Sequence, residues 1–336
     1  MPRTVELRSD TFTAPTDGMR QAMVDAVVGD DVWGTDPTVL ALQEKCAEMF
    51  GFEAGLFVVS GTMSNQLALR LLVPPGQEMI CHEDAHVVTY ERGAAAVHGQ
   101  ITTRTWTSPS PAEDVDWIES LIRAPGYGAV ATAAVEVENT HNARGGAIMP
   151  VQSLRQLRRI TQDRNVALHC DGARIWNAYA AGDLEFAECG LLFDTMSICL
   201  SKGLGAPVGS VMLGTADQVA EAREMRARLG AGWRQAGILA AAGIYAIDHH
   251  LDRLGEDHQK AQRLAKAAGI DYSKVETNMV PIRTTDARQL VAELAAEGVL
   301  AGAVAPDTVR LVTHLDVSED DVQYACDVLE RIVARY

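Results

Sequence analysis

The stretch Thr195-Met-Ser-Ile-Cys-Leu-Ser-Lys-Gly-Leu-Gly-Ala-Pro-Val-Gly-Ser-Val-Met-Leu-Gly214 places one lysine between two short apolar runs. Residues 196–200 and 210–213 are typical of buried strands, and the glycines and proline between them predict a turn. A lysine just beyond a strand end can keep its amine partly desolvated, which lowers the amine pKa and favours attack on carbonyls. A solvated loop lysine is the ordinary alternative for Lys202, so other motifs must decide between the two.

Outside this stretch, strand-like runs alternate with helical patterns. The strand-like runs lie at residues 56–59, 78–81, 100–105, 129–137 and 166–170, and helical patterns cover residues 37–50, 66–72, 111–123 and 150–163. Continuous apolar strands separated by helices predict a mostly parallel sheet that is covered on both faces. The predicted fold class is therefore α/β.

The last third of the chain has a different pattern. A helix is predicted over residues 216–229, followed by one long helix from near Trp233 to about Ala268. Short strands at 279–283, 300–304 and 308–312, with helices near 286–297 and 318–336, then predict a smaller α+β unit. We therefore predict a large domain over residues 1–250, including the N-terminal segment, and a small α+β domain over residues 251–336.

Composition excludes several classes of protein. The 336 residues are 47% hydrophobic and carry a formal charge of −16, so a broad basic surface for nucleic acid is not expected. Any anionic ligand must instead be held by a few placed cations. The six cysteines are scattered without a Cys-x-x-Cys pair, and no signal peptide or membrane span is predicted. A cytoplasmic protein with free thiols and no membrane partner is expected.

Polar residues follow the predicted strands at the points where the strands end. Ser60-Gly61-Thr62, His86, Asn139, Asp171 and Lys202 all occupy such places. In α/β sheets ligands collect at the carboxyl ends of the strands. The turn at Gly61 and Thr62 also leads directly from a strand into a helix, an arrangement that can hold a phosphate with backbone N–H groups or merely cap the helix.

A zinc protease is a competing interpretation. The run from His82 to His86 formally matches the H-E-x-x-H signature. That signature works on a helix, where both imidazoles share one face. His82 follows a strand-like run shortly after Pro74-Pro75-Gly76, so no helix is predicted there, and no metal site is expected.

An active lysine, a strand-end carboxylate, a hydroxyl-rich helix start and a histidine together predict a pyridoxal 5'-phosphate site. Lys202 would form the Schiff base with the cofactor aldehyde, and Asp171 would keep the ring nitrogen protonated. Gly61 and Thr62 would bind the phosphate. His86 would lie over the ring.

The chain resembles the low-specificity L-threonine aldolases of the β-eliminating lyase group, which have the aspartate-aminotransferase-like fold (fold type I) with a seven-stranded, mostly parallel sheet and a smaller C-terminal domain. The matching segments are Leu7-Arg-Ser-Asp-Thr11, Gly29-Asp-Asp-Val32 with Asp36-Pro-Thr38, Ser60-Gly-Thr-Met-Ser-Asn-Gln66, His86, Glu138-Asn-Thr-His-Asn142, His169-Cys-Asp-Gly-Ala-Arg174, Ser201-Lys-Gly-Leu-Gly-Ala-Pro207, Arg234-Gln-Ala-Gly237 and Val309-Arg-Leu-Val-Thr-His314. They span most of the chain in order.

The resemblance implies further roles. Ser9, Arg174 and Arg310 would bind the substrate carboxylate, with Arg174 also close to the cofactor, and arginine suits this role because its planar fork matches both carboxylate oxygens. Arg234 would reach the cofactor phosphate from a neighbouring subunit, within a homotetramer whose active sites lie at dimer interfaces. Trp33 stands where the family commonly has tyrosine, in a loop expected at the neighbouring subunit's pocket.

The implied reaction cleaves L-threonine, L-allo-threonine or a related β-hydroxy-α-amino acid to glycine and an aldehyde. A same-fold β-eliminating lyase, or an aldolase specialised for a bulkier substrate, is the alternative. The base that removes the hydroxyl proton would be His86 or an ordered water. The family's histidine near residues 126–128 is missing here, which leaves the preferred aldehyde open. A cofactor-binding regulator would have no need of Arg174 and Arg310.

Overall fold

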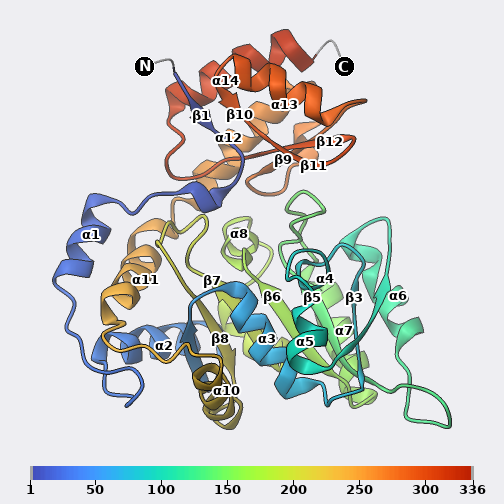
Figure 1. Cartoon of the computed structure of the whole chain (residues 1–336). Helices are drawn as coiled ribbons and strands as arrows, with labels where there is room; N and C mark the ends of the chain where they lie inside the picture. Colours follow the sequence, from blue (N-terminus) through green and yellow to red (C-terminus); the bar gives the residue numbers. More distant parts are fainter. Residues whose placement is uncertain (1–2, 334–336) are drawn as a thin grey trace.

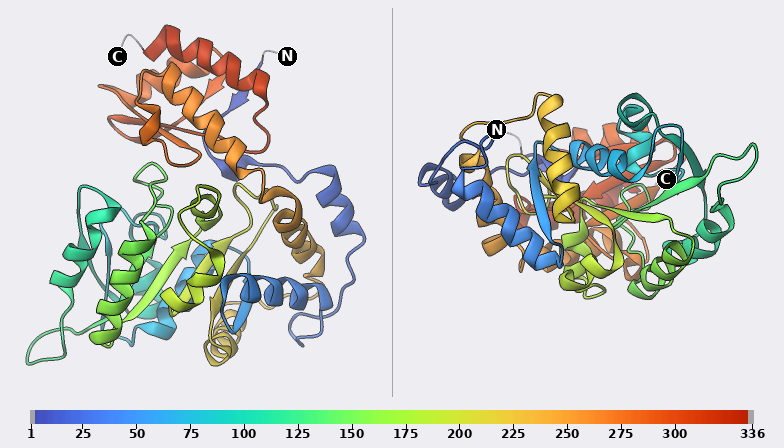
Figure 2. Two further views of the ribbon diagram at one scale, coloured as in Figure 1. Left: turned by 180° about the vertical axis from the view of Figure 1, so that it is seen from behind. Right: turned by 90° about the horizontal axis from the view of Figure 1, so that it is seen from below.

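The computed structural model describes residues 3–333, which form a large lower domain and a smaller upper one (Figure 1; Figure 2, left). The strands are β1 (Val5–Glu6), β2 (Ala54–Val58), β3 (Glu78–His82), β4 (Thr102–Trp106), β5 (Thr132–Glu138), β6 (Ala167–Gly172), β7 (Thr195–Cys199), β8 (Ser210–Gly214), β9 (Met279–Arg283), β10 (Val299–Leu300), β11 (Gly302–Ala305) and β12 (Thr308–Val312).

The described helices lie between these strands. They are α1 (Asp17–Val24), α2 (Pro37–Phe50), α3 (Gly61–Leu72), α4 (His86–Thr89), α5 (Ala94–Gly99), α6 (Asp114–Leu121), α7 (Val151–Asp163), α8 (Ile175–Ala180), α9 (Cys189–Leu192), α10 (Ala216–Arg228), α11 (Gly237–His250), α12 (Leu254–Ala267), α13 (Ala287–Ala296) and α14 (Glu319–Ile332). Within residues 3–333, no helix has the length and apolar character to cross a membrane.

The large domain is built on a seven-stranded sheet in the order β2-β8-β7-β6-β5-β3-β4. Strands β4, β3, β5, β6 and β7 pair in parallel, and β8 is antiparallel to both of its neighbours, so β2 again runs with the rest. Helix α3 covers one face of the sheet and α7 the other (Figures 1 and 2). The mostly parallel α/β sheet is confirmed.

Both sides of the central strands are buried, which explains their continuous apolar sequences. Val135, Leu168 and Ile198 are completely buried in β5, β6 and β7. One glycine shows how closely the strands pack. Gly209, just before β8, has φ +105°, and a Cβ there would lie 2.4 Å from the ring of Phe57 on β2.

Helix α2 begins and ends where the sequence predicts. The side chain of Asp36 accepts hydrogen bonds from the N–H groups of Thr38 and Val39, and Pro37 fills the first helical position. Gly51 ends the helix in the left-handed conformation with φ 71°.

The small domain has its own hydrophobic core, formed by residues of α12, α13, α14 and the three-stranded antiparallel sheet β11-β12-β9. This core also contains Val5 and Leu7, because β1 pairs in parallel with β10. The first strand therefore lies with the small domain, whereas the sequence placed the whole N-terminal segment with the large one. The division near residue 250 stays a prediction.

The long helix predicted between residues 233 and 268 is wrong in one respect, since it is two helices. The α-helical pattern stops at His250 and resumes at Leu254. Residues 251–253 contain neither glycine nor proline, although Gly255 follows in the first turn of α12. Helix α11 contributes to the first core alone, whereas α12 contributes Leu254 to the first core and Ala261 to the second, so the chain passes between the cores within α12, just after the break.

Candidate active site

The carboxyl ends of the parallel strands meet at the edge of the sheet that faces the small domain (Figure 1). A cavity of about 280 Å³ lies at this edge. Its lining includes Gly61, Thr62, His86, Cys199 and Lys202, which come from three different segments of the chain. The structure therefore brings together most of the residues that the strand-end argument singled out.

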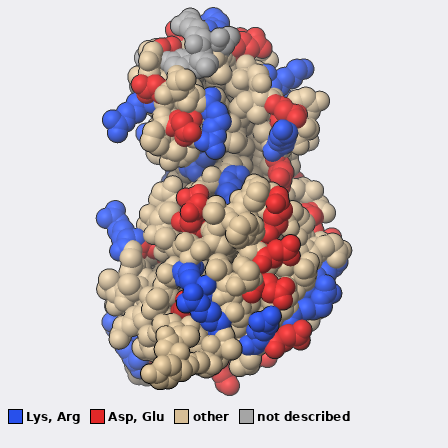
Figure 3. Space-filling view, turned by 90° about the vertical axis from the view of Figure 1, so that its right-hand side faces the viewer, with Lys and Arg blue, Asp and Glu red and all other residues tan. Residues whose placement is uncertain are grey.

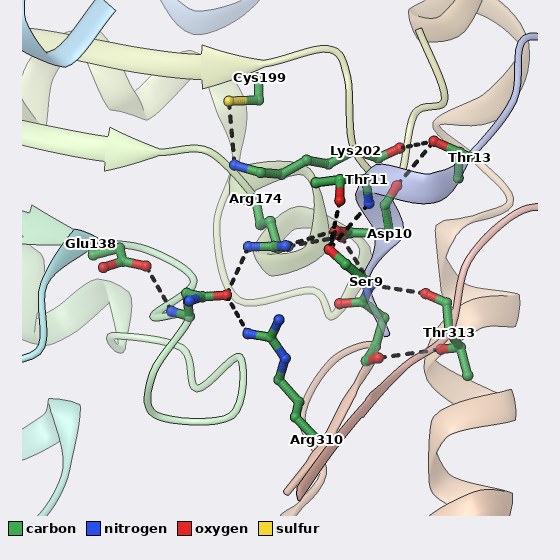
Figure 4. Close-up of polar contacts among 12 residues, drawn as sticks. Ser9, Asp10, Thr11, Thr13, Glu138, Arg174, Cys199, Lys202, Arg310 and Thr313 are labelled. Atoms are coloured by element: carbon green, nitrogen blue, oxygen red, sulfur yellow. Dashed lines mark hydrogen bonds and ion pairs between the residues drawn. The ribbon is translucent and has the colours of Figure 1, made fainter. Parts of the chain in front are cut away.

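Lys202 lies in the turn after β7, and its side chain runs toward the end of that strand (Figure 4). The ammonium nitrogen Nζ lies 3.5 Å from Cys199 Sγ. The backbone carbonyl of Lys202 accepts hydrogen bonds from Thr13 Oγ1 at 3.1 Å and from the Gly205 N–H at 2.8 Å. The turn is thus fixed through its backbone, and among the described residues no carboxylate forms an ion pair with the amine.

The start of α3 forms a cradle beside Lys202. Ser60 caps this helix by accepting from the Met63 N–H, while the N–H groups of Gly61 and Thr62 have no partner among residues 3–333. A Cβ at Gly61 would lie 2.8 Å from Cys199 Sγ, so glycine is required there. Free N–H groups at the start of a 12-residue helix bind phosphate well.

Asp171 ends β6 and is buried, with both carboxylate oxygens occupied by donors. The Asn65 side-chain amide donates to Oδ2 at 2.7 Å and the Ala173 N–H donates to Oδ1 at 3.0 Å. Asn65 is itself held by His169, whose other ring nitrogen contacts Thr195 Oγ1. This chain of hydrogen bonds, which runs through Asn65 of α3, fixes the direction of the Asp171 carboxylate.

His86 begins α4 and contacts a second buried carboxylate. Its Nδ1 lies 3.0 Å from Glu91 Oε1, and the amides of Asn65 and Gln66 donate to the two oxygens of Glu91. Burial alone would lower the pKa of His86, but the Glu91 hydrogen bond and the nearby Asp171 charge raise it above 6.5. Because Nδ1 faces Glu91, Nε2 is the nitrogen left for a substrate.

The site is rich in buried carboxyl groups. Burial and the Asp171 charge raise the pKa of Glu138 to about 7, and burial together with Asp171 and Glu138 raises the pKa of Glu136 well above its usual range. Neither oxygen of Glu136 has a hydrogen-bond partner within the described chain. The raised pKa values favour the neutral, protonated forms of Glu136 and Glu138. A cationic group beside Asp171, such as a protonated ring nitrogen, would pair with the Asp171 carboxylate.

The predicted carboxylate-binding residues lie between the N-terminal segment and the small domain (Figure 4). Arg174 donates from Nε and Nη2 to the two oxygens of Asp10, at 2.8 and 2.7 Å. Burial would raise the pKa of Asp10, but the charge of Arg174 holds it well below its usual range. Ser9 precedes this pair and accepts from the N–H of Thr11, so it also caps a short helical turn.

Arg310 approaches Arg174 from β12 of the small domain. Asn142 Oδ1 accepts hydrogen bonds from both arginines, at 2.7 Å from Arg310 and 3.2 Å from Arg174. The Asn142 N–H donates to Glu138 Oε1 at 2.7 Å, and Glu138 Oε2 accepts from the His86 N–H at 2.9 Å. Arg174 already has an acidic partner, whereas Arg310 has only a neutral one among residues 3–333.

Two predicted site residues lie elsewhere. Trp33 is 79% exposed, and Arg234 is 64% exposed on its side chain and pairs with Asp30 at 3.2 Å. Neither lines the cavity beside Lys202. The segment Gly126-Tyr127-Gly128 precedes β5 and so lies at the opposite edge of the sheet from Lys202. It therefore does not border the site of its own chain.

The competing zinc motif does not have the geometry that it requires. His82 is the last residue of β3 and His86 the first of α4, so the two imidazoles do not share a helix face. His82 Nδ1 accepts from the Asp84 N–H, and its ring contacts Trp106 and His141.

Sequence reasoning missed the residues that orient the site. Asn65, Glu91 and Asn142 have polar side chains on helices or loops, where such residues are ordinary. Asp10 stands in the run Ser9-Asp10-Thr11, whose residue types commonly cap helices, and its pairing with Arg174 spans 164 positions. The sequence does show acidic residues at the ends of strands, such as Glu138, and these residues could have indicated where the site lies.

The chain is similar to known proteins over most of its length. The family model of the beta-eliminating lyases matches residues 6–287. The chain is 42% identical over 324 residues to the low specificity L-threonine aldolase of Escherichia coli strain K12, covering 95% of this chain and 96% of that one. It is 37% identical to the low-specificity L-threonine aldolase 1 of Arabidopsis thaliana, covering 98% and 96%.

Among solved structures, the threonine aldolase of Leishmania major superposes with a TM-score of 0.81 at 20% identity, covering 97% of this chain and 98% of that one. A likeness at this identity concerns the fold, and it confirms the predicted fold class. The family match extends from the first strand across the whole large domain, and the relatives extend it through the small one. The chain therefore belongs to the β-eliminating lyase family.

Proposed function

We propose that this protein is a pyridoxal 5'-phosphate-dependent lyase that cleaves L-threonine or L-allo-threonine to glycine and acetaldehyde. The observation that carries the proposal is the placement of Lys202 and the free N–H groups of Gly61 and Thr62 around one cavity, with the Asp171 carboxylate held by Asn65 at the end of the neighbouring strand β6. These groups match the aldehyde, ring nitrogen and phosphate of the cofactor.

Each of these residues has a defined task. The amine of Lys202 would hold the cofactor aldehyde until a substrate amine replaces it. Asp171 would keep the ring nitrogen protonated, because its buried carboxylate would pair with the resulting cation. Bound pyridoxal phosphate supplies the electron sink that accepts the electron pair of the broken Cα–Cβ bond.

The substrate would be oriented by Arg310, with Arg174 and Ser9 beside it. Arg310 has no acidic partner of its own, so a substrate carboxylate would complete its pairing. His86 would take the proton from the substrate hydroxyl through Nε2, because Glu91 holds Nδ1.

The direct test is aldehyde release by the cofactor-loaded protein. Acetaldehyde and glycine should form in equal amounts from L-threonine and L-allo-threonine. Formation of pyruvate or 2-oxobutanoate from serine or threonine without glycine would instead support the β-eliminating alternative. If no product forms from any of these amino acids, the proposal is wrong.

The pH dependence of cleavage should reveal the His86–Glu91 pair. As a base, His86 must be neutral, and its pKa is raised, so kcat should fall as the pH decreases through a value above about 6.5. Glu91→Gln removes the charge that raises this pKa. The acid limb of the pH–rate profile should therefore move to lower pH, with a lower maximum rate.

A matched control is Glu83→Gln, because Glu83 is an exposed carboxylate in the preceding loop. Its pH profile should follow that of the unmodified protein. An acid limb that stays in place in Glu91→Gln would argue for an ordered water as the base.

The finer proposal is that the active sites are completed across a homodimer within a homotetramer. Among the described residues, Lys202 is the one lysine or arginine that lines the cavity near Gly61 and Thr62, so a phosphate bound there would lack an arginine. Arg234 is exposed, and the neighbouring loop displays Val32 and Trp33. Exposed apolar residues beside an exposed arginine, whose one ion pair is with Asp30 of its own loop, support an interface that carries Arg234 to the partner's cofactor.

Mixed dimers test this proposal. Arg234→Ala should weaken cofactor binding, and Lys202→Ala should be inactive. If Arg234 acts in the partner's site, dimers that combine the two variants contain one intact site. Mixing and reassembling equal amounts should then restore about one quarter of the unmodified activity, because half of the random dimers are mixed. No recovery would place Arg234 in its own chain's site or outside both sites.

We also propose a cytoplasmic location. All six cysteines are free and buried. Unpaired thiols in this number are typical of reducing compartments.

A further inference from the structure

A second and larger cavity lies between the two domains. It has a volume of about 550 Å³, and the molecule narrows at this level between the domains (Figure 3). Its wall includes Tyr90, Thr107 and Asn142 from the large domain and Arg283, Thr308 and Arg310 from the small one. None of the sequence motifs assigned it a role.

This cavity borders the proposed substrate position on two sides. Arg310 and Asn142 belong both to the carboxylate-binding group and to the cavity wall. The ring of Tyr90, which also lines the cavity, lies 5.5 Å from the ring of His86 at an interplanar angle of 31°. A substrate held at Arg310 with its hydroxyl at His86 would therefore have the cavity next to its β-carbon.

The cavity is larger than threonine needs. A methyl group is about the size of a water molecule, which occupies roughly 30 Å³ of the liquid. The methyl group of threonine would thus fill a small part of the space. Substituents of several atoms would fit.

Its wall also carries unused hydrogen-bonding groups. Within residues 3–333, the hydroxyls of Tyr90 and Thr107 have no hydrogen-bond partner. Arg283 donates from Nη1 to Asp307 and Thr308, while its Nη2 makes no hydrogen bond to a described residue. A site lined by such groups discriminates against a substituent that cannot hydrogen-bond, because the groups then lose water without a replacement.

We propose that this cavity is a subsite for the substituent on the substrate's β-carbon, and that it selects substituents of several atoms that carry hydroxyl groups. This inference rests on the proposed function, because it assigns the second half of the same substrate. It identifies the preferred substrates as polyhydroxylated β-hydroxy-α-amino acids.

The reverse reaction gives a direct test. Glycine adds through Cα to the aldehyde carbon, so one C–H bond breaks, one C–C bond forms, and the aldehyde oxygen gains the proton. Glyceraldehyde and pentanal have the same number of non-hydrogen atoms but differ in hydroxyl groups. We expect kcat/KM to be at least about tenfold higher for glyceraldehyde than for pentanal, because one to two net hydrogen bonds contribute a difference of that size.

Two variants test which residues of the cavity wall produce the preference for glyceraldehyde. Tyr90→Phe keeps the ring against His86 but removes the hydroxyl, and Arg283→Gln removes the free nitrogen. Each should reduce the glyceraldehyde-to-pentanal ratio by about threefold or more. Arg331→Gln is the matched control, because Arg331 is an exposed arginine of the same domain that pairs with Glu297. Its ratio should equal that of the unmodified protein.

Two results would overturn the inference. The first is a ratio near one in the unmodified protein, and the second is a ratio that neither Tyr90→Phe nor Arg283→Gln changes. Acetaldehyde serves as the reference aldehyde. Product from acetaldehyde in either case shows that the proposed function holds and the subsite assignment alone has failed, whereas no product from any aldehyde overturns both.

Discussion

Replacing Lys202 by alanine should lower the rate of threonine cleavage by about 10⁴-fold or more, the scale seen when a covalent catalytic group is removed. Lys202 is the one lysine in the wall of the cavity beside the α3 helix start. Its backbone carbonyl, not its side chain, makes the hydrogen bonds that fix the turn. The fold should therefore tolerate the change.

Borohydride reduction tests whether Lys202 is the lysine that binds the cofactor, and this test does not depend on an activity measurement. Reduction of the cofactor-loaded protein should attach one cofactor to the peptide that contains Lys202, and Lys202→Ala should show no such mass increase. Lys266→Ala is the control, since Lys266 is exposed on α12. A label on another lysine, or full activity in Lys202→Ala, would contradict the proposed chemistry.

The placement of Lys202 and Asp171 could be predicted because it depends on local pattern and on one rule of topology. Each residue follows an apolar run, and parallel strands bring their carboxyl ends to one edge. The order of the strands does not need to be known for this. The start of α2 at Asp36 and Pro37 likewise depends only on neighbouring residues in the chain.

The residues that orient the site could not be predicted in the same way. The Asp10–Arg174 pair and the contact between Asn142 and Arg310 join segments that are far apart in the chain and belong to different layers of the fold. Asp10 also satisfies a local capping pattern, which concealed its longer-range role. Such contacts depend on how the small domain and the N-terminal segment lie over the sheet.

The break between α11 and α12 has a related cause. The local stop signals are weak, since residues 251–253 contain neither glycine nor proline, and only His249 and His250 before the break and Gly255 after it favour a helix end. Helix α12 contributes Leu254 to the first core and Ala261 to the second. The break therefore lies next to the passage between the cores, and the position of a second core is not visible in a local residue pattern.

Replacing Arg310 by leucine should raise KM for L-threonine by about 100-fold, because at least one charged hydrogen bond and its ion pair are lost. The structure distinguishes Arg310 from Arg174 on this point. Arg174 is neutralised by Asp10 through two hydrogen bonds, so it contributes little net charge to a ligand. Arg310 faces only the neutral amide of Asn142 and is half-buried, which leaves its charge for the substrate.

A neutral substrate analogue separates charge recognition from general damage. L-threonine amide has nearly the size of threonine but lacks the carboxylate charge. The unmodified protein should prefer threonine over the amide by about 100-fold in kcat/KM, and Arg310→Leu should remove most of this preference. Arg331→Leu should retain it. If Arg310→Leu keeps the preference, Arg174 must bind the carboxylate, which would require the Asp10 pairing to open when the substrate enters.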